Sequence, residues 1–312
     1  MISVIIATKN RSEAIAAYAL RGLARQDEAD FEVLIWDASD DESTREIVDK
    51  QRNLFDTRGI DVVYKRAARP GLASQRNDAV RAARGDVVFF LDDDSEPSSD
   101  AVRVVRKYFD DFAWLKGMAL PLIDKSPGNA IRKRRMSAVE SFYRIHLAPT
   151  VIKRVISTST KHVVPLMDTP GSAEWLSGCC MAFRKDVFCD LQFDERLQRF
   201  GGYSWGEDAD FSHRVFLHYG EPLIIASEGH VVHHSSPGGR TGSDGVRLFA
   251  MHFYNTKIIR DNFKEYGKYG VMSFLWELRI RRPIFLLAGG YRFKDLIRGY
   301  LDYRKALREE KV

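Results

Sequence analysis

The stretch from Gly85 to Asp94 constrains the fold of this chain more than any other. An uninterrupted apolar run from Val87 to Leu91 ends in three adjacent aspartates, Asp92, Asp93 and Asp94. A run of strand length that is rich in valine and phenylalanine is typical of a strand covered on both faces in a parallel α/β sheet. The acids would then lie at the carboxyl end of the strand, where open α/β sheets bind their ligands.

Three neighbouring carboxylates repel one another, and a bound divalent cation would remove that cost. Mg²⁺ and Mn²⁺ prefer hard oxygen ligands and usually complete their coordination with substrate phosphates. The alternative is that the acids are solvated turn residues and a helix cap before Pro97 and Ser98.

Size and charge set broad limits on the function. The 312 residues suffice for one large domain, or for one domain with an appendage, and 45% of them are hydrophobic. The net charge of +5 is concentrated in two basic clusters, Arg132 to Arg135 and Arg279 to Arg282. No nucleic-acid signature accompanies them, so we expect no nucleic-acid partner. Each cluster is either a solvated helix face or a surface that attracts anionic lipid head groups.

The cysteines and the apolar runs of the chain indicate in which cellular compartment we expect the protein. Cys179, Cys180 and Cys189 form neither a disulfide framework nor a zinc-binding spacing, so we expect buried free thiols in a reducing environment. Met1 leads straight into an apolar strand, which predicts no signal peptide. The apolar run from Ile284 to Ala288 is too short to span a membrane. We expect a cytoplasmic protein.

Strands and helices alternate along the first part of the chain. Besides the stretch described above, the predicted strands are Ile2 to Ala7, Phe31 to Trp36 and Ile60 to Tyr64. The predicted helices between them run from a Ser12 cap, from Glu42 to Leu54 and from Leu72 to Arg84. This alternation predicts right-handed βαβ units and a parallel sheet.

Polar residues gather where these strands end. They are Thr8 and Asn10, then Asp37, then Arg66 and Arg69, and finally the aspartate triplet. A parallel sheet would bring them to one edge, and this mixture of acids and bases suits a phosphorylated, metal-bridged ligand. The first strand is followed neither by Gly-x-Gly-x-x-Gly nor by a Gly-Lys-Ser/Thr phosphate loop, which disfavours dinucleotide dehydrogenases and P-loop enzymes.

The alternation becomes less regular beyond Pro97. We expect a helix from Ser99 to Phe109, strands from Trp114 to Leu122 and from Glu174 to Phe183, and a mobile loop that includes Ser157 to Thr160. A helix should begin near Gly206, with acids in its first turn. We further expect short strands from Leu223 to Ala226 and from His230 to His233, a loop from Ser235 to Arg240, and helices from Val246 onward.

Several of these segments, taken in order, resemble family 2 glycosyltransferases, which have the GT-A fold and use nucleotide-sugar donors. The matching segments are Ser3 to Arg11, Phe31 to Asp41, Gly71 to Asn77, Phe90 to Asp94, Trp175 to Gly178 and Gly206 to Asp210. Gln75 departs from the family pattern Gly-x-x-x-Ala-Arg-Asn, which has Ala at that position. The resemblance covers about Ile2 to His234.

The resemblance implies a Rossmann-like, mostly parallel central sheet flanked by helices, with a helical C-terminal extension. We expect residues 1–240 to form the GT-A domain and residues 241–312 the extension. The implied activity is inverting, metal-dependent transfer of a sugar from a nucleoside-diphosphate donor, with UDP or dTDP favoured. The implied acceptor is a saccharide or a lipid-linked hydroxyl in surface polysaccharide synthesis. A sugar nucleotidyltransferase and a non-catalytic nucleotide-sugar-binding scaffold are the alternatives.

The resemblance also assigns residues to the donor side. Mg²⁺ or Mn²⁺ would be held by Asp94 with Asp92 nearby, and by His233, with His234 and His230 as competitors. Asp92 or Asp93 would contact the ribose, and Asp37 would accept the imino hydrogen of the base unless it caps the next helix. The remaining donor-binding candidates are Thr8, Asn10, Arg11, Ser39, Arg69 and Arg76. Arginine pairs well with phosphate, although a surface ion pair would also explain Arg69 or Arg76.

On the acceptor side a hydroxyl must lose its proton as it attacks the anomeric carbon. Asp208 is the expected general base and Glu207 the second candidate, while a helix N-cap is the structural alternative for Asp208. Trp175 and Trp205 would stack on sugar faces, or else pack in the core.

The C-terminal tail is basic and aromatic. Its cations, Arg281, Arg282, Arg292, Lys294 and Arg298, flank the apolar run from Ile284 to Leu287. This arrangement suits a helix lying on the inner face of a membrane, close to a lipid-linked acceptor. Packing on the catalytic domain, or on a second subunit in a homodimer, is the alternative.

Overall fold

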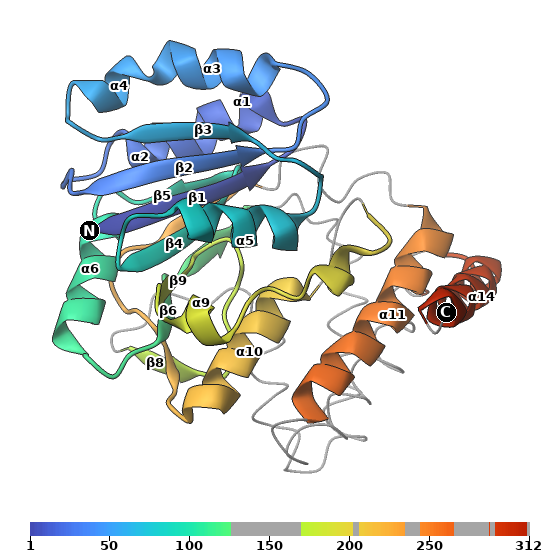
Figure 1. Cartoon of the computed structure of the whole chain (residues 1–312). Coiled ribbons are helices and arrows are strands. Elements are labelled where there is room, and N and C mark those ends of the chain that lie inside the picture. The colour runs from blue at the N-terminus through green and yellow to red at the C-terminus, as the bar shows by residue number, and fades with distance from the viewer. Residues whose placement is uncertain (126–169, 202–205, 235–243, 265–286, 288–290, 311–312) are drawn as a thin grey trace. The chain divides into compact units, whose positions relative to one another are not determined.

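The computed structural model describes residues 1–125, 170–201, 206–234, 244–264, 287 and 291–310 (Figure 1). The chain divides into two compact units. The first comprises Met1–Ser126, His162–Glu195 and Glu207–Gly239. The second comprises Pro127–Lys161, Arg196–Gly206 and Arg240–Val312.

A parallel core of four strands forms the centre of the first unit. They are β1 (Ile2–Thr8), β2 (Phe31–Asp37), β3 (Val62–Arg66) and β4 (Val87–Asp92), in the order β3-β2-β1-β4. All neighbouring pairs among them are parallel, as the alternation of strands and helices predicts. β3 begins two residues later than expected, because the N–H of Ile60 donates to the Phe55 carbonyl and closes the preceding turn.

Four short strands extend this sheet beyond β4. They are β9 (Met181–Arg184), β6 (Gly117–Ala119), β10 (Leu223–Ile225) and β8 (Gly171–Ala173). β9 runs antiparallel to both β4 and β6, so the sheet is mixed on this side. The expected continuous strand from Glu174 to Phe183 is wrong, since bends, turns and irregular backbone occupy residues 174–180 and only the last three residues of the range belong to β9.

A second, three-stranded sheet is made of β5 (Ser95–Pro97), β11 (Val231–His233) and β7 (Leu122–Asp124). The expected single strand from Trp114 to Leu122 is therefore also wrong: β6 and β7 belong to different sheets. Pro121 lies between them and has no N–H for a ladder bond. β11 pairs antiparallel with β5, which places His233 opposite Ser95.

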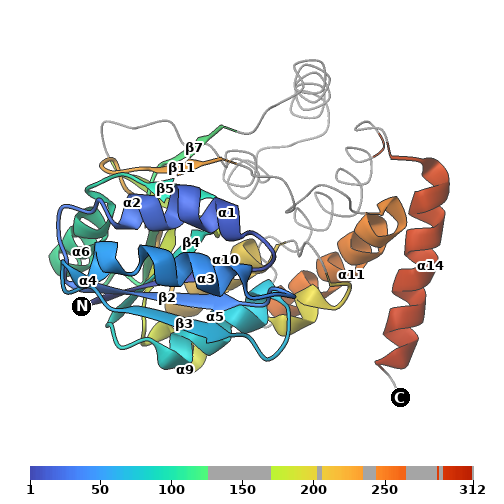
Figure 2. The ribbon, with the colours of Figure 1, turned by 90° about the horizontal axis from the view of Figure 1, so that it is seen from above.

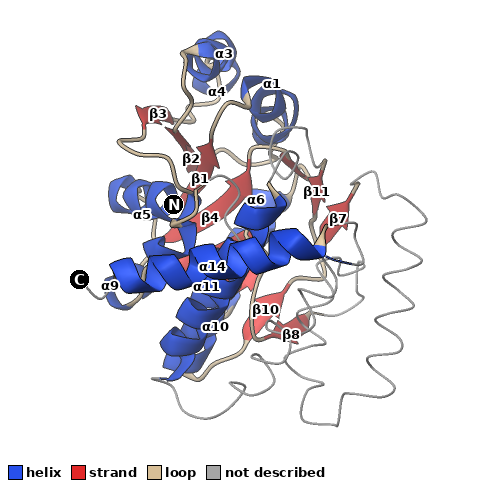
Figure 3. Cartoon of the chain, turned by 90° about the vertical axis from the view of Figure 1, so that its right-hand side faces the viewer, coloured by secondary structure: helices blue, strands red, loops and turns tan. Residues whose placement is uncertain are grey.

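Helices cover both faces of the parallel core, which explains why its strands are continuously apolar. The helices are α1 (Ser12–Ala14), η1 (Ile15–Leu20), α2 (Arg21–Leu23), α3 (Ser43–Gln51), α4 (Asn53–Asp56), α5 (Leu72–Ala82) and α6 (Ala101–Asp111). Figure 3 shows α5 on one face of the strands and α1 and α6 on the other. The expected Ser12 cap is wrong: Arg11 occupies the N-cap position and makes no side-chain capping bond.

Aromatic rings hold helix α10 (Glu207–Tyr219) against the sheet. Phe211 of α10 stacks on Phe193 and Phe188, with ring centroids 4.2 and 4.9 Å apart. Phe193 in turn meets the ring of Phe90 in β4 edge-on at 5.4 Å. Phe188 belongs to α9 (Val187–Asp190). This cluster fixes the start of α10 relative to the carboxyl end of β4. Carboxylates lie at the start of α10 and at the end of β4.

The three cysteines are free thiols, as expected. Cys179 and Cys180 are buried, but Cys189 is exposed, so the expectation of burial is wrong there. Cys189 lies in α9, one residue beyond the buried Phe188, and the helix turns it away from the core.

Two long helices dominate the described part of the second unit. α11 (Gly245–Lys264) and α14 (Phe293–Glu309) run side by side (Figure 2), and they confirm the expected C-terminal helices. Gly299 of α14 permits their close approach, because a Cβ there would lie 2.5 Å from the Val246 carbonyl oxygen. Within the part of the chain that the structure describes, no helix has the length and apolarity needed to cross a membrane.

Candidate active site

The carboxyl ends of the parallel strands bring the predicted polar residues into one row. Thr8 pairs with Asp37 across β1 and β2, and Asp37 pairs with Arg66 across β2 and β3. On the other side of β1, Ala7 pairs with Asp92. The sheet edge inferred from the sequence therefore exists, and its order along the row is Arg66, Asp37, Thr8 and Asp92.

Asp92, Asp94 and His233 form a group that could hold a metal ion. Each offers one ligand atom, and the three atoms lie within 4.8 Å of one another. The distance from His233 Nε2 to Asp94 Oδ1 is 3.3 Å. Two carboxylates and an imidazole suit Mn²⁺, and the carboxylates suit Mg²⁺. The donor set therefore fits the divalent cation that the sequence predicts.

Strand β11 selects His233 over its neighbours. The N–H of His234 donates to the Asp94 carbonyl oxygen at 2.9 Å, which holds the end of β11 beside the aspartates. The His234 ring points elsewhere: it stacks on Tyr18 with centroids 3.9 Å apart, and its Nε2 lies 3.0 Å from Glu96 Oε2. His230, the other competitor, precedes β11 and is not part of the metal-binding group.

Burial, hydrogen bonds and neighbouring charges shift the pKa of His233 and of Asp93. Burial lowers the pKa of His233, but the hydrogen bond to Asp94 and the nearby negative charges outweigh that effect and raise it to about 9. Burial raises the pKa of Asp93 to about 7, although Arg11 and the Thr8 hydroxyl oppose the shift. Divalent cations compete with such protons for their ligands, so binding should release a proton from His233.

Arg11 and Thr8 hold the middle of the aspartate triplet. The Thr8 hydroxyl donates to Asp93 Oδ2 at 2.7 Å, and Arg11 Nε lies 3.0 Å from Asp93 Oδ1. Arg11 also donates to Asp94. Asp93 is 5% exposed. The last residue of β1 and the turn after it therefore contact the aspartates through one hydroxyl and one guanidinium.

Arg76 connects the metal-binding group with the acids of α10. Its guanidinium lies 3.2 Å from Asp92 Oδ1 and 3.3 Å from Glu207 Oε1, and it also donates to the Gly178 carbonyl at 3.2 Å. Arg76 is only 2% exposed, so the alternative of a surface ion pair is wrong. A buried guanidinium between two carboxylates lowers their mutual repulsion and fixes their spacing.

Glu207 and Asp208 are adjacent but differ in their surroundings. Glu207 is 5% exposed, and its pKa is raised by burial and by the neighbouring Asp208 charge, with Arg76 opposing the shift. Asp208 is half-buried, and its Oδ2 accepts the N–H of Gly178 at 2.9 Å. It is the second residue of α10, so the N-cap alternative for Asp208 is wrong.

Gly178 lies where Arg76 and Asp208 come closest to the chain. Its N–H donates to Asp208 and its carbonyl accepts from Arg76. A Cβ at this position would lie 2.9 Å from Arg76 Nη2 and 3.1 Å from Asp208 Cβ. Only glycine fits here without displacing one of the two side chains.

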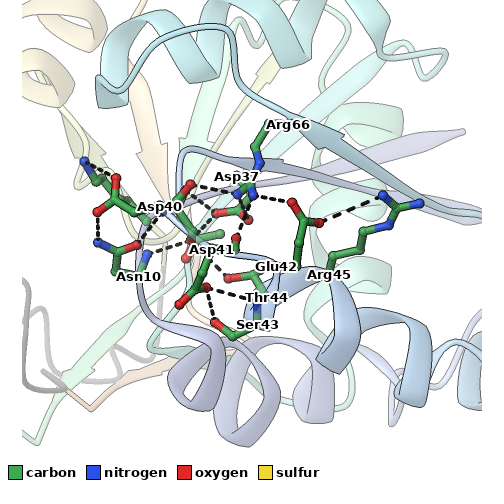
Figure 4. Close-up of polar contacts among 12 residues, drawn as sticks. Asn10, Asp37, Asp40, Asp41, Glu42, Ser43, Thr44, Arg45 and Arg66 are labelled. Carbon is green, nitrogen blue, oxygen red and sulfur yellow. Dashed lines mark hydrogen bonds and ion pairs between the residues drawn. The ribbon is translucent and has the colours of Figure 1, made fainter.

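A polar network surrounds Asp37 at the end of β2 (Figure 4). Its Oδ1 accepts the Ser39 N–H at 2.8 Å and the Ser39 hydroxyl, and its Oδ2 accepts the Tyr64 hydroxyl at 2.7 Å and Arg66 at 3.3 Å. Asp37 is completely buried. A nucleobase would therefore have to replace Tyr64 or Arg66 in order to bond with Asp37.

Asn10 ties the turn after β1 to the turn after β2. Its side chain donates to Asp40 Oδ2 and accepts the Asp40 N–H, at 2.7 and 2.8 Å. Its backbone N–H donates to Ser39 Oγ at 2.7 Å. Asn10 adopts a left-handed φ of 55°, which asparagine tolerates better than most residues. The two predicted donor-binding turns thus form one surface.

The remaining predicted residues lie further apart. Arg69 is exposed and pairs with Glu195. Trp175 precedes Leu176, whose N–H donates to Ser212 Oγ at 2.9 Å and so fastens the Trp175 loop to α10. Four expected features lie outside the described residues: Trp205, the loop from Ser157 to Thr160, the loop from Ser235 to Arg240 and both basic clusters.

Sequence reasoning missed three contributors to this site. Gln75, which replaces the alanine of the family pattern, donates to the carbonyls of Thr8 and Trp36 and joins the ends of β1 and β2. The Tyr64 hydroxyl donates to Asp37. Tyr64 lies two residues before Arg66 and therefore on the same face of β3, and this spacing could have identified it as a site residue. The role of Gly178 had no local signal, because it depends on side chains far away in the sequence.

Comparison with known proteins agrees with this geometry. The model of the family described as "Glycosyl transferase family 2" matches residues 3–191. The chain belongs to glycosyl transferase family 2. The matched region contains the aspartate triplet, Arg76 and Gly178, but it ends before α10 and β11. No curated protein matches this family 2 glycosyltransferase in sequence.

Solved structures similar to this glycosyltransferase share its GT-A fold. S. aureus TarS 1-349 in complex with UDP-GlcNAc has a TM-score of 0.63 at 17% identity, covering 97% of this chain and 80% of that one. The mannosyltransferase PcManGT from Pyrobaculum calidifontis, in complex with GDP-Man and Mn²⁺, has a TM-score of 0.56 at 17% identity, covering 92% and 72%. GalNAc-T7 with UDP, GalNAc and Mn²⁺ has a TM-score of 0.51 at 15% identity, covering 93% and 58%.

Proposed function

We propose that this glycosyltransferase is an inverting, metal-dependent enzyme that transfers a sugar from a nucleoside-diphosphate donor to a hydroxyl group. One observation carries the proposal: Arg76 joins Asp92 of the metal-binding group to Glu207 of the acid pair. Donor chemistry and acceptor chemistry need these two groups side by side. Asp92, Asp94 and His233 would hold Mg²⁺ or Mn²⁺, which neutralises charge on the departing diphosphate.

The donor would lie along the row of strand ends. Thr8, Asn10, Arg11, Ser39 and Asp37 form the surface proposed for the nucleoside, with Asp92 or Asp93 near the ribose. Arg69, which is exposed, is free to turn towards a phosphate if its pair with Glu195 opens. UDP-GlcNAc in TarS and GDP-Man in PcManGT show that similar folds accept more than one base. We retain UDP or dTDP as the proposed donor type.

Asp208 is the proposed general base. As the acceptor oxygen forms its bond to the anomeric carbon, the bond from that carbon to the diphosphate breaks, and the acceptor proton passes to Asp208. The partial exposure of Asp208 supports this choice over Glu207, which is buried and paired with Arg76. Attack from the side opposite the leaving group inverts the anomeric centre. Trp175 is the proposed acceptor contact, together with Trp205.

The proposed setting is cell-surface polysaccharide synthesis in the cytoplasm, at or near the inner face of the membrane. The acceptor would be a saccharide or a lipid-linked hydroxyl. The basic and apolar segments of the tail support contact with the membrane, and a homodimer is a separate proposal.

The test is a screen of nucleotide sugars for release of nucleoside diphosphate, with Mn²⁺, with Mg²⁺ and with EDTA. We expect turnover with at least one uridine or thymidine sugar, dependent on the metal and lost in Asp94→Ala. Asp86→Ala is the matched control, because its side chain is 91% exposed and remote from the group. Calorimetric titration of Mn²⁺ with UDP should show the same loss in Asp94→Ala. Metal-independent turnover by Asp94→Ala would refute the metal assignment.

A further inference from the structure

Helix α14 carries an apolar stripe that faces solvent. Phe293 is 64% exposed, Ile297 48%, Leu301 58% and Tyr300 41%. Ile297 lies four residues after Phe293, and Tyr300 and Leu301 lie three and four residues after Ile297, which places these side chains on one face of the helix. Large apolar side chains grouped in this way on a soluble unit usually mark a binding surface.

The opposite face of α14 is already occupied. Gly299 packs on Val246 and Phe249 of α11, and Asp295 and Ala306 are buried at 6% and 5% exposure. Phe293, Ile297 and Leu301 therefore lie on the side of α14 away from Gly299, whereas the Tyr300 ring meets Phe253 of α11 edge-on, with centroids 5.5 Å apart. Contacts between the two helices explain the buried face and the Tyr300 ring, but they do not explain the exposure of Phe293, Ile297 and Leu301.

Cations lie along one side of the stripe and at its C-terminal end. The exposed basic residues of α14 are Lys294, Arg298, Arg304, Lys305 and Arg308. Its exposed acids are Asp302 and Glu309, both on the side of the helix away from Ile297. An aromatic and aliphatic stripe with cations along its edges is typical of helices that lie in a membrane interface.

We propose that this face of α14 binds a bilayer surface carrying anionic head groups, with the helix parallel to the membrane plane. Phe293, Ile297 and Leu301 would enter the boundary between head groups and acyl chains. Tyr300 would lie at head-group level, where tyrosine is enriched, and the cations would meet lipid phosphates. This inference deepens the membrane contact proposed above and rests on it. The surface shares Lys294 and Arg298 with the predicted one around Ile284, but its apolar residues are different.

A second copy of the chain fits the same surface less well. With roughly 150–250 Å² for a fully exposed large side chain, the four exposed fractions leave on the order of 400 Å². That is about half of the ~800 Å² that each partner buries in a standard interface. Pairing two copies of this face would also bring like charges together, whereas an anionic membrane complements them.

Sedimentation of the full chain with vesicles tests the proposal. Vesicles of phosphatidylcholine with 30% phosphatidylglycerol should bind the protein at low salt, and binding should weaken in 0.5 M NaCl. Pure phosphatidylcholine should bind it at least tenfold more weakly. Because each cation contributes about a fivefold factor, the double variant Lys294→Gln/Arg298→Gln should bind anionic vesicles roughly 25-fold more weakly.

The apolar contribution needs its own variant. Phe293→Ser/Leu301→Ser should lower binding to anionic vesicles at least tenfold while circular dichroism stays unchanged. Leu54→Ser is the matched control, because Leu54 is 47% exposed in α4, far from α14 in the sequence. This variant should bind vesicles as the wild type does. Equal binding by wild type and both double variants would overturn the proposal. So would a concentration-dependent dimer that Phe293→Ser/Leu301→Ser abolishes, because the occupant would then be a second copy.

Discussion

Arg76 and Glu207 are 131 positions apart in the sequence, yet they form a buried ion pair, with Arg76 Nη1 3.3 Å from Glu207 Oε1. The same guanidinium lies 3.2 Å from Asp92. A substitution at Asp92 or at Glu207 therefore affects the other carboxylate through the Arg76 side chain. Cation–π contacts with Phe90 and Phe193, at 5.7 and 5.5 Å, hold the guanidinium in place.

The first prediction is a double-mutant cycle on this pair. Arg76→Met leaves the buried Glu207 and the half-buried Asp92 without their cation and should lower the free energy of unfolding by about 3–5 kcal/mol. Glu207→Gln should cost less, because the amide oxygen still accepts from Arg76. The double variant should be more stable than the sum of the two losses indicates, with a coupling of about 1–3 kcal/mol. Urea unfolding measures all four proteins.

The exposed pair Arg103 and Asp27, at 2.9 Å, provides the control for that cycle. Coupling there should stay below about 1 kcal/mol, because exposed ion pairs are screened by solvent. If the losses at Arg76 and Glu207 simply add, the buried pair does not exist in solution.

A second prediction follows from the raised pKa of Glu207. Its ordinary value is 4.5 and its value in the fold is about 7. Between these values the folded protein holds a proton that the unfolded chain releases, so the contribution of Glu207 to stability is present at low pH and falls as the pH rises. Thermal melts from pH 4.5 to 8 in EDTA should show wild type losing stability relative to Glu207→Gln across this window. Parallel curves for the two proteins would contradict the raised pKa.

The third prediction separates the two acids in catalysis. Asp208→Asn keeps the shape and removes the basicity, so turnover should fall by about a hundred- to ten-thousandfold while donor affinity changes little. Glu207→Gln should reduce turnover less, because the Glu207 carboxylate is buried against Arg76. The measurement is the transfer rate and donor affinity of both variants. If only Glu207→Gln loses turnover, Glu207 and not Asp208 is the general base. If both variants lose donor binding, the two acids belong to the nucleotide-binding site.

The fourth prediction concerns Gly178. Gly178→Ala would push a methyl group against Arg76 and Asp208, so turnover should fall at least tenfold while the melting temperature changes by only a few degrees. Gly59→Ala is the control, because Gly59 has a positive φ of 71° and nothing within 4 Å of an added Cβ. It should cost stability through backbone strain and leave turnover intact. Full activity in Gly178→Ala would show that this contact does not position the base.

Much of the fold could be predicted because its signals are local. The apolar run from Val87 to Leu91 identified a strand covered on both faces, and the polar residues after each strand identified the binding edge. Predictions failed where the signal was not local. The expected strands Trp114 to Leu122 and Glu174 to Phe183 are mostly apolar. The first is divided at Leu120 and Pro121 between two sheets, and only the last three residues of the second belong to a strand. Apolar periodicity reports burial and does not show which neighbour a strand will have.

The candidate site divides in the same way. The sequence alone determined which residue types meet at the strand ends, because the aspartate triplet, Thr8 and Asp37 directly follow strands whose parallel order brings their ends together. Only the tertiary structure decided that His233 rather than His234 joins Asp92 and Asp94, and that Arg76 is buried between two carboxylates. Those outcomes depend on how β11 pairs with β5 and on how the aromatic cluster seats α10. Long-range packing sets both of these, and no local pattern in the chain encodes such distances.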